Sequence, residues 1–129
     1  MSKDSLLSQS KLVAFTATTN RDRARAFYEG VLGLPVVEDS PFAVAFDAHG
    51  TMLRVTIVPE HHPAPFTVLG WDVASIEDAV KQLTAAGVVF LRYPGMNDRD
   101  PLGIWTAPSG ARIAWFHDPD ENVLSLTQF

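Results

Sequence analysis

The charged side chain with the clearest chemical potential is Arg54, which stands inside the apolar segment TMLRVTI. Alternation along a strand puts Arg54 on one face together with Met52 and Thr56. A guanidinium that faces an enclosed space needs an anion or water, because an unpaired buried charge is costly. We therefore predict one of two roles for Arg54. It forms an internal salt bridge, for example with Asp72, or it clamps a carboxylate or other anionic group of a ligand.

A second group that could do chemistry is the run of carboxylates in DPDEN near the C-terminus. Asp118, Asp120 and Glu121 flank Pro119, and the composition predicts a tight turn. Asp and Asn side chains in such turns usually bind backbone N–H groups. We therefore assign these carboxylates a structural role and not general acid–base catalysis.

The histidines give no pattern that predicts a catalytic or metal centre. They are His49, His61, His62 and His117. Each lies in or beside a predicted turn or in a proline-rich segment, so we expect solvated side chains. The sequence has no HExxH motif, no Ser/His/Asp order and no phosphate-binding glycine loop.

The elements that must position these residues form two similar halves. The first half is predicted as a strand at 12–19, a helix from about 21 to 32 and strands at 35–38, 42–47 and 51–58. The second half is predicted as a strand at 66–73, a helix that ends at Gly87 and strands at 88–92, 103–106, 111–117 and 122–127. Asn20 and Ser75 are predicted N-caps at equivalent places in the two halves.

This order predicts an α+β fold with duplicated βαβββ modules. We expect one domain over residues 1–129, with a first module at about 11–58 and a second at about 66–127. The segment PEHHPAP at 59–65 is the predicted linker, because its prolines disfavour regular structure. The second copy also carries a longer loop, at 93–103, than the first.

The composition narrows the class of partner. The chain has 129 residues, of which 47% are hydrophobic and 19% charged, so it can bury a sizeable core. A formal net charge of −5 disfavours nucleic acid and anionic membranes as partners. Because the chain contains no cysteine, thiolate nucleophiles and thiolate metal sites are excluded. No signal peptide or membrane span is recognisable, so we expect a cytoplasmic protein.

Two segments resemble a known superfamily. RARAFYEGVLGL at 23–34 resembles the first helix of the vicinal oxygen chelate (VOC) proteins, which include glyoxalase I, bleomycin resistance proteins and extradiol dioxygenases. WFHDPDENVLSL at 115–126 resembles their last hairpin. The resemblance implies that the two modules form a U-shaped cavity with the helices outside. It also implies a homodimer.

Metal-dependent members of that superfamily hold a divalent ion with side chains from four strands. The positions that match those ligands here are Val13, Arg54, Val68 and Ser125. Valine has no donor atom, arginine is a permanent cation, and a lone serine hydroxyl is a poor ligand for a hard ion. The resemblance therefore implies a member without the usual metal site, and we predict no cofactor.

The same alternation predicts which side chains line the cavity. The predicted ligand-binding residues are Phe15, Arg54, Asp72, Trp105, Trp115 and Ser125. Trp71 is expected under a helix and Phe116 in the core. The loop at 92–103, with Arg92, Tyr93 and Met96 near its start, is predicted either as a lid over the cavity or as a cover for a sheet edge.

We weigh three hypotheses for function. The first is metal-independent binding of a small anionic or aromatic molecule, as in bleomycin-resistance-like sequestration. The second is a lyase, isomerase or dioxygenase-like enzyme with unusual metal ligands or none. The third is a protein whose cavity has closed and which acts through its dimer surface. The aromatic residues and Arg54 favour the first hypothesis.

Overall fold

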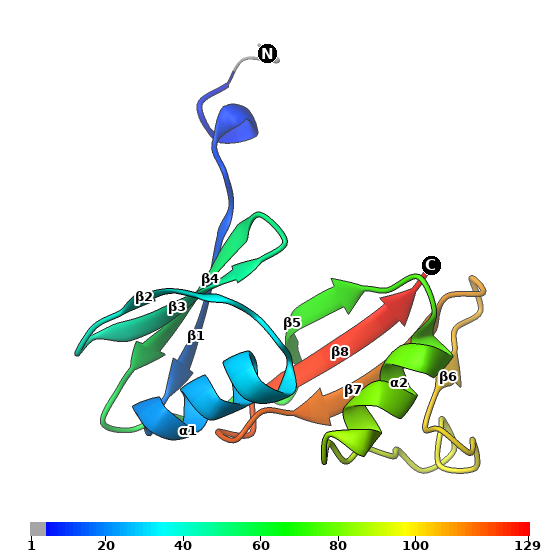
Figure 1. The fold of residues 1–129 in the computed structure, drawn as a ribbon. Helices are drawn as coiled ribbons and strands as arrows, with labels where there is room; N and C mark the ends of the chain where they lie inside the picture. Colours follow the sequence, from blue (N-terminus) through cyan, green and yellow to red (C-terminus); the bar gives the residue numbers. More distant parts are fainter. Residues whose placement is uncertain (1–4) are drawn as a thin grey trace.

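The computed structural model describes residues 5–129. The first module contains β1 (Val13–Thr18), α1 (Arg21–Arg25), the π-helical turn η2 (Ala26–Val31), β2 (Val36–Asp39), β3 (Ala43–Ala48) and β4 (Thr51–Ile57). The second contains β5 (Thr67–Asp72), α2 (Ile76–Ala85), β6 (Trp105–Thr106), β7 (Arg112–His117) and β8 (Val123–Gln128). A short 3-10 turn, η1 (Leu7–Gln9), precedes β1 in a segment that extends away from the body of the molecule (Figure 1).

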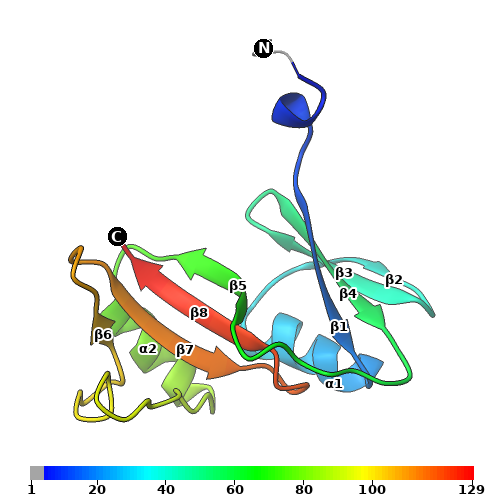
Figure 2. The same cartoon turned by 180° about the vertical axis from the view of Figure 1, so that it is seen from behind.

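The two modules build sheets of the same design. The strand orders are β1-β4-β3-β2 and β5-β8-β7-β6. In each sheet the first strand pairs with the last in parallel, and the other pairs are antiparallel. This confirms the α+β class and the duplicated βαβββ modules. The helices lie in front of the sheets in Figure 1 and behind them in Figure 2, so each sheet has a face that no helix covers.

The helices start as the sequence predicts. The side chain of Asn20 accepts a hydrogen bond from the backbone N–H of Arg23 at 3.0 Å, and Ser75 does the same for Asp78 at 3.4 Å. Gly87 follows α2 with φ of 100°, a conformation that costs a glycine little. The first helix differs from expectation in one respect, because its second half widens into a π-helix.

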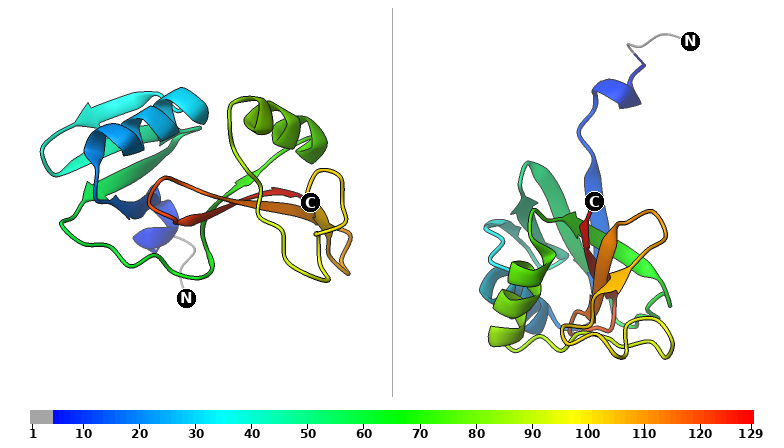
Figure 3. Two further views of the ribbon diagram at one scale, coloured as in Figure 1. Left: turned by 90° about the horizontal axis from the view of Figure 1, so that it is seen from below. Right: turned by 90° about the vertical axis from the view of Figure 1, so that its right-hand side faces the viewer.

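One continuous core joins the two modules. Leu53 and Val55 of the first sheet and Leu124 and Leu126 of the second face the helices and belong to the same cluster of buried side chains. Phe27 of η2 contacts Phe116 of β7 at a ring-centroid distance of 6.5 Å. The helix of the first module therefore packs against both sheets, and the helices lie on the same side of the molecule (Figure 3).

The turn between β7 and β8 provides a polar connection between the modules. Asp118 Oδ1 accepts the backbone N–H groups of Asp120 and Asn122, both at 2.9 Å, which confirms the predicted structural role of this turn. Asp118 Oδ2 accepts the hydroxyl of the buried Tyr28 at 2.7 Å. Burial and the negative charge of Asp118 raise the pKa of Tyr28, so its hydroxyl stays a donor.

Asp120 reaches further into the first module. Its carboxylate accepts the hydroxyls of Thr18 and Thr19 and the backbone N–H of Thr19, and it pairs with Arg23 at 2.8 Å. Burial would raise the pKa of Asp120, but these hydrogen bonds and the charge of Arg23 hold that pKa below its usual value. The side chain of Asn122 also donates to the carbonyl of Ala17 at 3.0 Å.

Two predicted strands of the second module are wrong or shorter than expected. Residues 88–92 form only an isolated bridge, between Phe90 and Phe116, and the strand predicted at 103–106 is limited to Trp105 and Thr106. The segment between them satisfies its backbone groups with its own side chains. It therefore has no need of a neighbouring strand.

Candidate functional site

Trp115 lies at the centre of the helix-free face of the second sheet. It stands opposite Ser125 in the β7–β8 register, and Ser125 stands opposite Gly70 on β5. The indole of Trp115 contacts Trp105 at a ring-centroid distance of 6.0 Å and Tyr93 at 5.5 Å. All three rings are half-buried. We call Tyr93, Trp105 and Trp115 the aromatic wall.

A pocket of about 330 Å³ opens beside this wall. It is lined by Pro65, Phe66, Thr67, Tyr93, Met96, Trp115 and Val123. Phe66 is 65% exposed and Met96 45% exposed, so large apolar side chains stand free at its rim. Apolar walls with few polar groups and a volume in this range are typical of small-molecule sites. Pro65 of the predicted linker and Phe66, which was predicted to begin a strand but precedes β5, were not expected to line this site.

Ser125 sits within the sheet beside this pocket and is only 6% exposed. A Cβ atom placed on Gly70 would lie 3.0 Å from Ser125 Oγ, so the glycine makes room for the hydroxyl. Strand alternation points Ser125 away from Leu124 and Leu126, which face the core. Ser125 therefore belongs to the helix-free face, as its sequence position suggested.

Arg54 and Phe15 lie together on the helix-free face of the first sheet. The register places Phe15, Arg54, Ala45 and Glu38 in one row across four strands. Arg54 Nη1 donates to Glu38 Oε2 at 2.7 Å. Arg54 thus has a carboxylate partner, but the partner is Glu38 and not the suggested Asp72. The row contains the small Ala45 between the two charged residues, which lets the long arginine side chain cross to β2.

Asp72 lies elsewhere. It ends β5, stands opposite Thr127 and is exposed. The predicted ligand-binding residues therefore fall into two groups in this chain. Phe15 and Arg54 are on the first sheet, whereas Asp72, Trp105, Trp115 and Ser125 are on the second.

The four positions that match metal ligands lie on β1, β4, β5 and β8. Val13 is 40% exposed and Val68 is 37% exposed. Across residues 5–129, His, Cys, Asp and Glu side chains form no group of three or more that could hold a metal ion. Two histidines of the linker have other partners: His61 is hydrogen-bonded to Asn122 at 2.7 Å and His62 to Glu60 at 3.0 Å.

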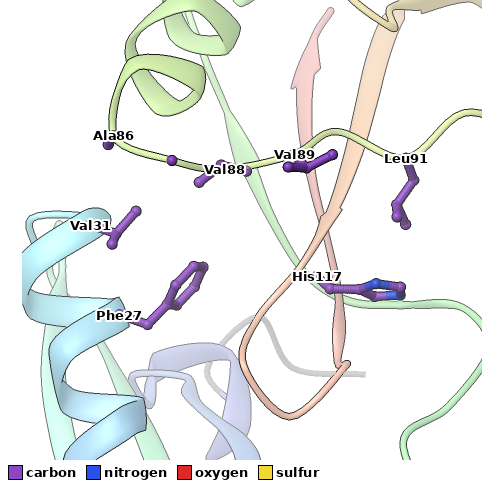
Figure 4. Close-up of a pocket in the computed structure, with 8 residues that line it drawn as sticks. Phe27, Val31, Ala86, Val88, Val89, Leu91 and His117 are labelled. Carbon is purple, nitrogen blue, oxygen red and sulfur yellow. The ribbon is translucent and has the colours of Figure 1, made fainter.

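A further pocket, of about 400 Å³, lies on the helix side of the molecule. Figure 4 shows Phe27 and Val31 of η2 facing the segment after α2, with His117 nearby. Its other lining residues are Ala86, Gly87, Val88, Val89 and Leu91. None of the predicted ligand-binding residues lines it. Within the described part of the chain no helix is long and apolar enough to cross a membrane.

Comparison with known proteins assigns the family. A model described as the Glyoxalase/Bleomycin resistance protein/Dioxygenase superfamily matches residues 13–126. That span is most of the chain, so the protein belongs to this superfamily, and the resemblance to VOC proteins is confirmed. A comparison with curated protein sequences gives no match.

Solved structures agree with this assignment. A member of the same superfamily from Sphaerobacter thermophilus is 26% identical, with a TM-score of 0.73 and coverage of 96% of this chain and 100% of the other. Lactoylglutathione lyase from Agrobacterium tumefaciens is 18% identical, with a TM-score of 0.70 and 93% of both chains covered. TioX from Micromonospora sp. ML1 is 20% identical, with a TM-score of 0.70 and coverage of 92% and 98%. At 18% and 20% identity, the likeness to the last two structures shows the fold alone.

Proposed function

We propose that this VOC-fold protein binds a small aromatic molecule on the helix-free face of the second sheet, without a metal ion and without chemical turnover. The aromatic wall carries this proposal. Three half-buried rings stand beside an apolar pocket, where Tyr93 and Trp105 each contact Trp115. Such rings offer a large apolar surface and favour stacked or edge-on aromatic partners. This function is of the sequestering kind found in bleomycin resistance proteins.

The charges favour an aromatic ligand over one held mainly by its negative charge. Glu38 already compensates Arg54, and the chain carries a formal net charge of −5. An anionic ligand would have to displace Glu38 or approach an overall negative protein. Arg54 is then a secondary contact at most.

Arg54→Ala should weaken 1-naphthoate binding less than Trp115→Ala does, as measured by isothermal titration calorimetry.

We also propose that the protein is a homodimer whose second copy closes the binding site. The helix-free side carries Phe15 at 61% exposure, together with the exposed Val13, Met52 and Val68. Isolated exposed apolar residues are common, but Val13, Phe15 and Met52 are grouped on neighbouring strands of the first sheet, and such a group favours an interaction surface. A second copy that covers this face would bring its own Phe15 and Arg54 near an aromatic wall.

A calorimetric screen of aromatic compounds tests the binding proposal. Wild-type protein should bind flat aromatic molecules, and Trp115→Ala should weaken that binding about tenfold or more, since it removes the central ring. Trp71→Phe is the matched control, because Trp71 packs against the core on the other face of the sheet. Equal binding by wild type and Trp115→Ala would reject the aromatic wall as the site.

Elemental analysis tests metal independence. Protein purified without added metal should contain no stoichiometric divalent ion, and a chelator should leave ligand affinity unchanged. One tightly held ion per chain would overturn the proposal and favour the alternative of a lyase, isomerase or dioxygenase-like enzyme with unusual ligands.

A further inference from the structure

The segment at 91–103 is folded around one buried side chain, that of Asn97. Asn97 is 1% exposed. Its Nδ2 donates to the carbonyls of Leu91 at 2.9 Å and Gly103 at 2.7 Å, and its Oδ1 accepts the backbone N–H of Tyr93 at 2.7 Å. One amide therefore ties the two ends of the segment to each other and to Tyr93.

Arg92 strengthens this arrangement from the other side. Its guanidinium donates to the carbonyls of Asn97 at 3.3 Å and Pro101 at 3.2 Å and also binds the carbonyl of Asp100. The carboxylate of Asp100 accepts the backbone N–H groups of Leu102 and Ile104, both at 2.9 Å. A loop whose backbone is bound in this way has little freedom to open and close.

These bonds determine where the ring of Tyr93 lies. Leu91 donates its backbone N–H to the carbonyl of Trp115 at 2.8 Å, which docks the segment on β7. The side-chain amide of Asn97 binds the backbone carbonyl of Leu91 and the backbone N–H of Tyr93, so it fixes both residues relative to this docking point. The ring of Tyr93 then stands edge-on to the indole of Trp115, with an interplanar angle of 81°.

We propose that residues 91–103 are a fixed wall of the binding site and not a lid, that Asn97 is the residue that positions this wall, and that Tyr93 selects aromatic over saturated ligands. The selection by Tyr93 rests on the function proposed above. The positioning by Asn97 does not, because it concerns the contact between Tyr93 and Trp115 in the free protein.

Fluorine NMR of protein labelled with 5-fluorotryptophan tests the positioning. The chain has three tryptophans, and Trp115→Phe and Trp71→Phe assign the resonances of Trp115 and Trp71. Tyr93→Leu should shift that resonance by removing the neighbouring ring. Asn97→Asp, which keeps the size of the side chain but loses the Nδ2 donor, should shift it in the same direction. The resonance of Trp71 should stay in place, which also shows that the variant is folded.

Arg99→Ala changes an exposed residue of the same segment and should leave the Trp115 resonance unmoved. If Asn97→Asp does not fold, Arg92→Lys replaces it, because lysine keeps the charge but lacks the planar, five-donor guanidinium that reaches the separate carbonyls of Asn97, Asp100 and Pro101. A Trp115 resonance that shifts in Tyr93→Leu, but shifts in neither Asn97→Asp nor Arg92→Lys, would overturn the positioning role of Asn97.

Calorimetry with a pair of probes tests the selection by Tyr93. 1-Naphthoate and its saturated counterpart decahydro-1-naphthoate carry the same charge, so their affinity ratio reports the aromatic contact. Tyr93→Leu and Asn97→Asp should each lower that ratio about threefold to tenfold, and Arg99→Ala should not. An unchanged ratio in Tyr93→Leu would overturn the selection. Absence of binding by the wild type would count against the proposed function, while the fluorine resonances would still decide the positioning.

Discussion

At the scale of single residues, the buried hydroxyl of Tyr28 is the most consequential polar group outside the candidate site. It is fully buried and donates to Asp118 at 2.7 Å. Tyr28→Phe should lower the free energy of unfolding by about 1–3 kcal/mol, because a buried carboxylate loses a donor. Urea denaturation measures this change. Tyr93→Phe is the control, since within residues 5–129 the Tyr93 hydroxyl makes no hydrogen bond, and an equal loss there would contradict the explanation.

Asp120 should make the stability of the protein sensitive to acid. Its folded-state pKa is lowered, so its contribution is present above the unfolded-state pKa of about 4 and is lost as the pH falls through the folded-state value. Asp120→Asn should lower the free energy of unfolding by about 1–3 kcal/mol at pH 7. The difference from wild type should shrink below pH 4 in thermal unfolding experiments. Asp22→Asn, at a side chain that is 90% exposed, is the control and should change the free energy of unfolding at pH 7 much less than Asp120→Asn does.

At the scale of elements, two glycines of the helical regions should respond to alanine in opposite directions. Gly87 has φ of 100°, so Gly87→Ala should destabilise the protein by about 1–2 kcal/mol. Gly30 lies within η2 at negative φ, and nothing lies within 4 Å of an added Cβ, so Gly30→Ala should stabilise by about 0.5–1 kcal/mol. Thermal melts of both variants measure the difference. The same sign for both would show that local backbone strain does not decide the outcome.

The elements also show what the sequence can predict and where it stops. The caps at Asn20 and Ser75 and the repeated strand order follow from local patterns and are confirmed. The partner of Arg54 could not be derived, because it depends on the register between β2 and β3, which contains a bulge between Val36 and Glu38. The segment at 91–103 was also beyond local patterns, since its conformation depends on one buried amide.

The same difference between regular strands and connecting segments applies to the residues of the candidate site. Alternation along β7 and β8 was enough to put Trp115 and Ser125 on one face. The contribution of Pro65 from the linker was not predictable, because no periodic pattern fixes how a proline-rich segment runs across a sheet. Residues on regular strands were thus more accessible to sequence reasoning than residues on connecting segments. For the loop at 92–103 the sequence named Tyr93 and Met96 as possible cavity residues, but not the bonds that position them.

At the scale of the whole molecule, we expect a dimer formed through the helix-free side. Sedimentation velocity should give the mass of two chains. Phe15→Glu should weaken the association about tenfold or more, since it places a charge on an exposed apolar face. Val89→Glu is the matched control, because Val89 is 81% exposed but lies by the pocket on the helix side. A wild-type protein that sediments as a monomer at every concentration would refute the proposed assembly.

The bonds of Asp120 have a consequence for how the protein is made. Thr18 and Asp120 are joined across 102 residues of sequence, and Asn122 reaches back to Ala17. The ribosome adds Asp120 at 102 residues after Thr18, and Asn122 at 105 residues after Ala17, so the strands of the first module are synthesised well before these two partners. The end of β1 therefore gains these bonds only after the turn before β8 has been synthesised, and a chain cut short before β8 would expose an incomplete module to aggregation and proteolysis.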